Sequence, residues 1–261
     1  MSLTINDLDD TAAPTAGAFV QPLRSDGEFG NYGAFAARRS DGSVVSWGNG
    51  ATGGGEGISV GADVQEVFSS AYAFAALKAD GSVQTWGADS AGGDSSSVQA
   101  DLVNVESIFS TKYAFAALTS DGAVVTWGHP SLGGDSSSVP TGALDSGVVE
   151  LFSNQGAFAA LKADGTVVTW GDSSYGGDSS SVADQLQGGV SQIFSTGGAF
   201  AALKDDGSVV TWGDSDWGGD SSSVSSQLSS GVTKVFSTDH AFAALKDDGS
   251  VITWGHSSYG G

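Results

Sequence analysis

The stretch FSTGGAFAALKDDGSVVTW, residues 194–212, decides the fold, because the chain contains six copies of this block. Each copy has a first Phe, a second Phe six residues later, an Asp-Gly pair, and a Trp eighteen residues after the first Phe. The copies span residues 29–47, 68–86, 109–127, 152–170, 194–212 and 236–254, and only the connecting stretches differ in length. A fixed block that recurs about every 40 residues predicts a repeat architecture.

The block itself predicts a small antiparallel sheet. An Asp-Gly pair between two alternating runs indicates a hairpin with a two-residue type I′ turn. In the copy quoted, that turn sets Phe200 opposite Gly213 and Ala201 opposite Trp212, so the two large rings lie on opposite faces. Residues 189–194 alternate well enough to form a third strand. Both faces of this sheet are largely apolar, so we expect it to be buried on both sides.

Six sheets of this kind bury their faces most simply by stacking around an axis, because an open stack would leave two apolar end faces. We therefore predict an all-β fold, a β-propeller of six blades, with seven as the alternative. The blades are mostly three-stranded, and pairing of the N- and C-terminal strands closes the ring. Residues 1–17 are polar and form a flexible lead-in, whereas residues 18–261 form a single propeller domain. Within it, residues 18–27 resemble a degraded copy and supply the closing strand. The repeated Phe and Trp rings are predicted to be core rather than a cofactor-binding box.

The pattern GVxxxFSTxxAFAALKxDGSVVTWGDSSYGG, which the later copies share, resembles the repeat of the regulator-of-chromosome-condensation family. It is most similar to short-repeat bacterial members that include secreted β-lactamase inhibitor proteins. The connector SSSVP at residues 136–140 and the strand start SGVV at residues 146–149 carry that likeness. The resemblance implies a propeller of three-stranded blades that binds a partner with the loops of one face. The chain departs from the family in having Ala where its His precedes the Ala-Leu pair, and it has no basic tail, so exchange-factor or chromatin activity is not implied.

Charge and composition exclude several partners. Thirty acidic residues against nine basic ones give a formal charge of −21, which argues against nucleic acid and anionic membrane surfaces. The chain has no Cys and no apolar run long enough for a membrane span, so we predict neither a thiolate site nor membrane insertion. The first ten residues lack the basic and apolar regions of a signal peptide.

Residues suited to catalysis or metal binding are sparse. The three histidines are His129, His240 and His256. We expect the repeats to separate them, which leaves no catalytic set and predicts a protein that is not an enzyme. The acidic connector residues that could offer oxygens to Ca²⁺ are Asp172, Asp178, Asp214, Asp216 and Asp220. The ligand spacings of known calcium loops are absent, so no cofactor or metal is predicted. Hydrogen bonds within turns are the favoured role for these side chains.

Two positions differ freely between copies, five residues after each block Trp and just before each AFAA motif. Both are predicted on the end of the sheets opposite the Asp-Gly hairpins, so all the variation collects on one loop face. Exposed aromatic side chains on loops of a rigid scaffold are typical of recognition surfaces, although drift at unimportant loop tips is the alternative. The predicted partner-binding residues are Tyr72, Tyr113, Leu132, Tyr175, Trp217, His240 and Tyr259.

These observations predict a non-catalytic propeller module that binds a protein or a glycan through that face. We expect a monomeric module of a longer chain, located outside the cell or on its surface. A structural spacer in a giant exported or surface protein, and a glycan-active enzyme, are the two alternatives.

Overall fold

The computed structural model describes residues 30–55 and 60–261, and the statements below concern these residues. The fold is all-β, with one two-stranded and five three-stranded antiparallel sheets. In chain order the sheets contain β1 (Ala34–Arg38) and β2 (Val44–Gly48); β3 (Val64–Ser69), β4 (Ala73–Lys78) and β5 (Val83–Gly87); β6 (Val105–Ser110), β7 (Ala114–Thr119) and β8 (Val124–Gly128); β9 (Val148–Ser153), β10 (Ala157–Lys162) and β11 (Val167–Gly171); β12 (Val190–Ser195), β13 (Ala199–Lys204) and β14 (Val209–Gly213); β15 (Val232–Ser237), β16 (Ala241–Lys246) and β17 (Val251–Gly255). Each repeat thus forms one sheet, and the predicted third strand at 189–194 is confirmed by β12.

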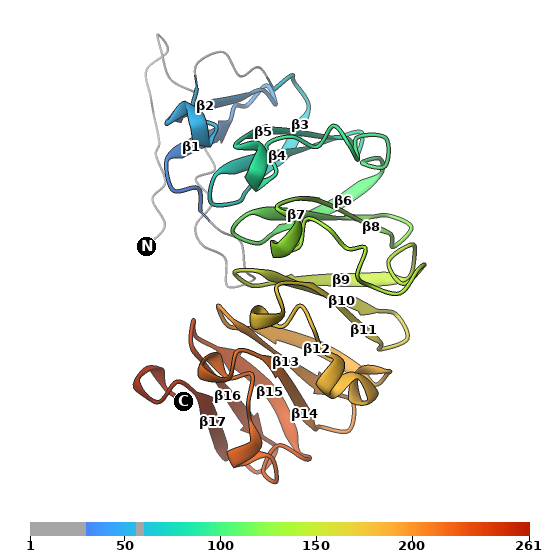
Figure 1. Cartoon of the computed structure of the whole chain (residues 1–261), viewed down its shortest axis with the longest axis vertical. Helices are drawn as coiled ribbons and strands as arrows, with labels where there is room; N and C mark the ends of the chain where they lie inside the picture. The colour runs from blue at the N-terminus through green and yellow to red at the C-terminus, as the bar shows by residue number, and fades with distance from the viewer. Residues whose placement is uncertain (1–29, 56–59) are drawn as a thin grey trace.

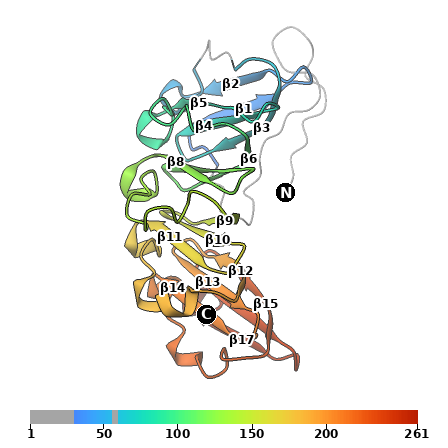
Figure 2. The ribbon, with the colours of Figure 1, turned by 90° about the vertical axis from the view of Figure 1, so that its right-hand side faces the viewer.

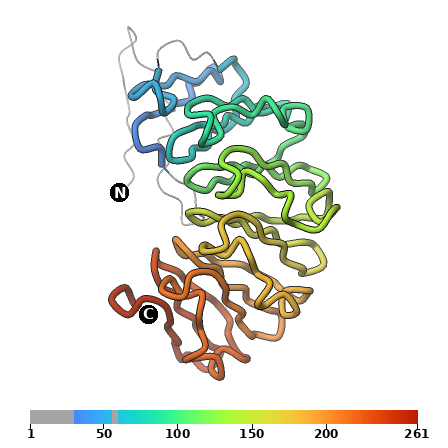
Figure 3. Tube along the Cα trace, viewed as in Figure 1, coloured from blue at the N-terminus to red at the C-terminus, as the bar shows by residue number. Residues whose placement is uncertain are grey.

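The six sheets follow one another along the long axis of the molecule, from β1–β2 at one end to β15–β17 at the other (Figure 1). The Cα trace shows a curved stack whose two ends stay apart (Figure 3). The described residues form an open arc of six sheets, as predicted in number and type; the predicted closure of the ring depends on residues that are not described and stays a prediction. Residues 18–27, which we expected to supply the closing strand, lie outside the described residues, as do the lead-in 1–17 and Phe29 of the first block.

The hairpin register differs by one residue from our prediction. Phe200 pairs with Trp212 and Ala199 pairs with Gly213, because the loop has three residues, 205–207, and not two. Lys204 N–H donates to the Ser208 carbonyl, Gly207 N–H donates to the Lys204 carbonyl, and only Gly207 has a positive φ, 76°. This is a type I turn followed by a left-handed glycine, which is the usual three-residue hairpin.

The corrected register puts both large rings of a repeat on one face. Phe200 and Trp212 stack with their ring centroids 5.4 Å apart, and the other five repeats contain the same stack. We call this side the ring face; in β13 and β14 it carries Phe200, Ala202, Val210 and Trp212. The opposite side, the alanine face, carries Ala199, Ala201, Leu203 and Val209.

The core lies between successive sheets and is built in the same way each time. The ring face of one sheet packs on the alanine face of the sheet before it. Phe200 and Trp212 contact Ala157, Ala159 and Leu161 of the preceding sheet. In the next layer, Phe242 and Trp254 contact Ala199, Ala201 and Leu203. Small alanines on one side leave room for large rings on the other, which confirms the predicted core role for the second Phe and the Trp of the five later copies, whereas Phe35 and Trp47 of the first copy are exposed.

Neighbouring sheets are joined by hydrogen bonds as well as by apolar contacts. The indole N–H of Trp212 donates to the Gly176 carbonyl of the preceding repeat at 3.1 Å, and Trp127, Trp170 and Trp254 make the equivalent bond. At the hairpin end, Val232 N–H donates to the Gly207 carbonyl, and four earlier sheet pairs share this backbone bond. Each sheet is thereby fixed in position on the next. None of the helical turns in the described residues is long and apolar enough to span a membrane.

Candidate functional site

The candidate site is the end of the stack opposite the Asp-Gly hairpins, which we call the loop face. It consists of the loops between the first and second strands and the short 3-10 turns that follow the third strands. These turns are η1 (Gly50–Thr52), η2 (Asp89–Ala91), η3 (Pro130–Leu132), η4 (Ser173–Tyr175), η6 (Ser215–Trp217) and η8 (Ser257–Tyr259). Two further turns, η5 (Ser180–Leu186) and η7 (Ser222–Val224), lie in the connectors. Figure 2 shows the turns along one side of the stack.

A short polar side chain in every repeat holds the two loops together. Thr111, which is fully buried, donates to the Leu132 carbonyl at 2.8 Å and accepts from the Tyr113 and Ala114 N–H groups. We call the residues at this position the clamp residues: Asn31, Ser70, Thr111, Asn154, Thr196 and Thr238. Each has one donor for the carbonyl of the 3-10 turn and one acceptor for the strand loop. The loop face is therefore a fixed surface.

Backbone hydrogen bonds also run along the loop face from one repeat to the next. Tyr32 N–H donates to the Ala71 carbonyl, and the N–H of Ala71 donates in turn to Lys112. The series continues through Gln155 and Gly197 and ends at the Asp239 carbonyl, with distances of 2.9–3.2 Å. The Lys112 ammonium also donates to the Gln155 side chain at 2.6 Å, so side chains reinforce the same path.

The two variable positions compensate each other in size in the second, fourth and fifth repeats, whereas the third pairs Tyr113 with Leu132 and the sixth pairs His240 with Tyr259. Where the residue before AFAA is Gly156 or Gly198, the turn supplies a ring: a Cβ at Gly156 would lie 2.9 Å from Tyr175, and one at Gly198 would lie 3.0 Å from Trp217. Where that residue is Tyr72, the turn ends in the small, buried Ala91. In these three repeats the two positions share one space, which the comparison of each position by itself does not show.

The structure places the predicted partner-binding residues in two aromatic clusters. In the first, Tyr72 lies 5.3 Å from Tyr113 between ring centroids, with Tyr32 and His129 at its two ends. In the second, His240 lies between Trp217, at 4.0 Å, and Tyr259, at 4.4 Å. His256 joins this second cluster, 6.1 Å from His240. The expected separation of all three histidines is thus wrong for this pair, because both belong to the sixth repeat.

Leu132 and Tyr175 lie between the two clusters. Both side chains reach Gly156, since a Cβ built there would lie 3.0 Å from Leu132 and 2.9 Å from Tyr175. All seven predicted residues therefore belong to the loop face. Five of them form the two aromatic clusters, and Leu132 and Tyr175 lie between these clusters at Gly156.

Sequence reasoning missed the clamp residues and three ring residues of the loop face. The clamp position contains only Ser, Thr or Asn in all six copies, which was a usable signal for a side chain that both donates and accepts. The missed ring residues are Tyr32, His129 and His256. Each occupies a position where most of the other copies have no aromatic residue, so comparing the copies did not single them out.

Four of the five acidic connector side chains accept hydrogen bonds within turns, as predicted. Asp172 and Asp214 cap η4 and η6 by accepting a backbone N–H two residues ahead. Asp178 and Asp220 do the same in the connectors, and hydrogen bonds from Ser180 and Ser222 hold the pKa of each carboxyl below its usual value. Within the part of the chain that the structure describes, no group of three metal-ligating side chains comes together.

Electrostatics within the first cluster favour neutral tyrosines. A hydrogen bond with the Tyr72 side chain, followed by burial, raises the pKa of Tyr113 above its ordinary value. The cluster therefore offers hydroxyl groups that can donate as well as accept, next to apolar ring surface.

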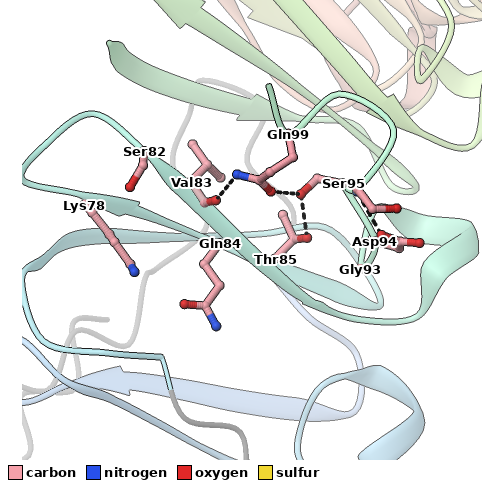
Figure 4. Close-up of a pocket in the computed structure, with 10 residues that line it drawn as sticks. Lys78, Ser82, Val83, Gln84, Thr85, Gly93, Asp94, Ser95 and Gln99 are labelled. Atoms are coloured by element: carbon pink, nitrogen blue, oxygen red, sulfur yellow. Dashed lines mark hydrogen bonds between the residues drawn. The ribbon is translucent and has the colours of Figure 1, made fainter. Parts of the chain in front are cut away.

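A polar hollow lies beside the second sheet (Figure 4). Its inner wall is a hydrogen-bonded set in which Ser95 contacts Thr85 at 3.0 Å and Gln99 at 3.1 Å, while Gln99 donates to the Val83 carbonyl. These groups fasten the connector to β5, so we assign the hollow a structural role.

No protein-family model matches the chain, and no curated protein matches it. Solved structures do resemble it. Human WBSCR16 is 18% identical with a TM-score of 0.51, over 86% of this chain and 75% of that one. Prp20p from Saccharomyces cerevisiae, the yeast RCC1, is 17% identical with a TM-score of 0.47, over 91% and 67%. The ectodomain of the Arabidopsis thaliana receptor kinase ACR4 is 15% identical with a TM-score of 0.45, over 86% and 77%. The chain is thus distantly similar in structure to RCC1-like propellers, with sheets that resemble their blades, and this likeness concerns the fold alone.

Proposed function

We propose that this protein is a non-catalytic binding module that recognises a protein partner through its loop face. The observation that carries the proposal is the pair of aromatic clusters on loops that the clamp residues hold in place. Rigid Tyr and Trp side chains give a large contact area at low cost in conformational entropy. Their hydroxyl and ring nitrogen groups add hydrogen bonds that a specific partner can satisfy.

The charge of the chain suggests the kind of partner. At −21 the molecule repels strongly acidic surfaces, so a neutral or basic protein suits it best. The finer resemblance to secreted bacterial inhibitor propellers supports the same use of one loop face, and it supports a location outside the cell or on its surface.

A glycan is the second candidate ligand. The rings of Tyr32 and Tyr259 are 62% and 55% exposed, so each offers a free face on which the apolar side of a sugar could stack. An array of glycans distinguishes this ligand class from a protein.

The proposal is tested by substituting Tyr72, Tyr113 and Tyr259 with Ala together. These rings are chosen because Tyr175 and Trp217 fill the space above glycines and would lower stability if removed. Wild-type and variant proteins are screened against purified secreted proteins and a glycan array, and any hit is measured by calorimetry. We expect binding to weaken about a hundredfold or more, because such rings are typical hot spots.

The matched control is a double substitution of exposed valines outside the loop face, Val103→Ala and Val149→Ala. This control should bind as the wild type does. A partner that binds the triple variant and the wild type equally would refute the role of the loop face. Turnover of a glycan by the wild type would instead show an enzyme.

A further inference from the structure

The two ends of the stack expose the two halves of the interface that joins all the other sheets. At one end the ring face of β1–β2 is open, with Phe35 54% and Trp47 45% exposed. The equivalent rings of the five other sheets are at most 7% exposed, because each packs on a preceding alanine face. At the other end the alanine face of β15–β17 is open, with Phe236 56% and Val251 60% exposed.

Polar groups of the interface are also unpaired at the two ends of the stack, with donors at one end matching acceptors at the other. In the backbone series of the loop face, each N–H donates to the carbonyl of the next repeat. At its last described residue, the Asp239 N–H is left as a free donor. At its first described residue, the Tyr32 carbonyl is left as a free acceptor. Four Trp indoles donate to the carbonyl of a left-handed glycine that follows the 3-10 turn of the preceding repeat. Among the described residues, Trp47 is the equivalent indole without a preceding repeat, and Gly260, with φ 104°, is the equivalent glycine without a following one.

The space at Gly260 matches this pattern. A Cβ on Gly92, Gly133 or Gly218 would lie 2.5–2.7 Å from the second Phe of the following repeat. A Cβ on Gly260 would meet nothing within 4 Å. The last repeat thus has an open position where its neighbours hold a Phe ring, and Phe35 is the exposed ring of that kind.

We propose that two copies of this chain associate head to tail, with the ring face of β1–β2 in one copy packed on the alanine face of β15–β17 in the other. Phe35 takes the open position at Gly260, Trp47 donates to the Gly260 carbonyl, and Asp239 N–H donates to the Tyr32 carbonyl. The apolar packing of this contact repeats an interface that the chain forms five times within itself, and the indole bond occurs at four of those five, since the buried Trp86 indole has no partner. It is heterologous, so a third copy can add in the same way.

The association has a predictable dependence on salt and places the loop faces side by side. Because each copy carries a charge of −21, repulsion between copies opposes contact, and added salt should strengthen it. The exposed Tyr259 of one copy comes next to the exposed Tyr32 of the other, which would join their aromatic clusters into one longer surface.

The test uses one variant blocked at each end of the full chain. Trp47→Glu blocks the head, Val251→Glu blocks the tail, and Val103→Glu is the control, an exposed valine within the array. Mass is measured by sedimentation over a range of protein and salt concentrations. The wild type and the control should grow in steps of the 26.0 kDa chain mass as concentration rises. Each blocked variant should stay a single chain, and an equimolar mixture of the two should form a complex of two chains and nothing larger.

Several results would overturn the proposal. A wild type that stays monomeric at all concentrations would show that the end faces are covered within one chain. Blocked variants that still pair by themselves, or a mixture that stays monomeric, would show that the contact is not head to tail. Circular dichroism checks that each variant is folded. If Trp47→Glu unfolds, Phe35→Ser serves as the head variant, and Gly260→Leu is a second tail variant that fills the open position directly.

Discussion

At the scale of single residues, the loop face depends on the clamp residues more than on the rings it displays. Thr111 joins three backbone groups, two on the strand loop and one on the 3-10 turn, within one buried side chain. Asn and Thr can replace each other here because an amide and a hydroxyl both supply a donor and an acceptor. A side chain of the same shape without these groups would leave buried N–H and carbonyl groups without partners.

We therefore predict that Thr111→Val lowers the free energy of unfolding by about 1–3 kcal/mol, the usual cost of leaving buried polar groups unsatisfied. Urea unfolding followed by Trp fluorescence measures this change. Thr111→Ser should recover most of the loss, and Thr233→Val, at an exposed threonine that donates to the Leu245 carbonyl, should change little. A Thr111→Val protein as stable as the wild type would rule out the clamp.

At the scale of the strand and turn, the left-handed glycine of each hairpin also serves the neighbouring sheet. Gly207 adopts φ 76°, and its carbonyl accepts from Val232 of the next repeat. A Cβ at Gly207 would lie 2.8 Å from Gly231 N, whereas Gly249, the same residue of the last hairpin, has nothing within 4 Å. The two glycines share a conformation, but among the described residues only Gly207 has a following repeat beside it.

This difference predicts the outcome of a matched pair of substitutions. Gly249→Ala should cost about 1–2 kcal/mol, the strain of a left-handed residue with a Cβ. Gly207→Ala should lower the unfolding midpoint by clearly more, because the added methyl group also pushes the next sheet away. Equal shifts for the two variants in urea unfolding would mean that the hairpin does not contact the next repeat in solution.

The same hairpins show which parts of the fold the sequence could predict. The Phe and Trp positions predicted the core and the number of sheets, because apolar residues at fixed spacing need a packed environment. The register was mispredicted by one residue, since Asp-Gly suits both a two-residue turn and the end of a three-residue loop, and the following Ser208 that bonds Asp206 favours the second. Phe200 and Trp212 were therefore predicted on opposite faces of the sheet but lie on the same face.

The candidate site was predictable in place but not in detail. Variation between copies located the loop face, because residues outside the packed block are free to differ. Comparing positions one at a time could not show that Gly198 and Trp217 share one volume, nor that His240 and His256 meet. Those facts depend on how two loops of one repeat approach each other in space.

At the scale of the whole molecule, stability comes from contacts between neighbouring sheets. The sheets in the middle of the stack have a neighbour on both sides, while β1–β2 and β15–β17 each have one neighbour among the described residues (Figure 1). In arrays of this kind, stability is approximately a sum of the repeats and their nearest-neighbour interfaces.

We predict that backbone amides of β1 and β16 exchange with solvent about tenfold faster or more than those of β7 and β10, as expected for regions that open locally. Hydrogen exchange is measured at a dilution where the mass is that of one chain. Concentrating the wild type should slow exchange at both ends and leave β7 and β10 unchanged. Uniform exchange along the chain at high dilution would instead indicate a single cooperative unit.

The contact between the two variable positions of a repeat has a consequence for how this surface can change. A bulky residue at one position faces a small one in pairs such as Gly198 with Trp217 and Tyr72 with Ala91, whereas His240 and Tyr259 lie ring against ring, 4.4 Å apart. Because the two side chains of a repeat meet, new specificities are reached by paired exchanges, repeat by repeat, with the strands unchanged. A combinatorial library built on this scaffold should randomise the two positions of a repeat jointly, treating the molecule as a row of two-residue cassettes.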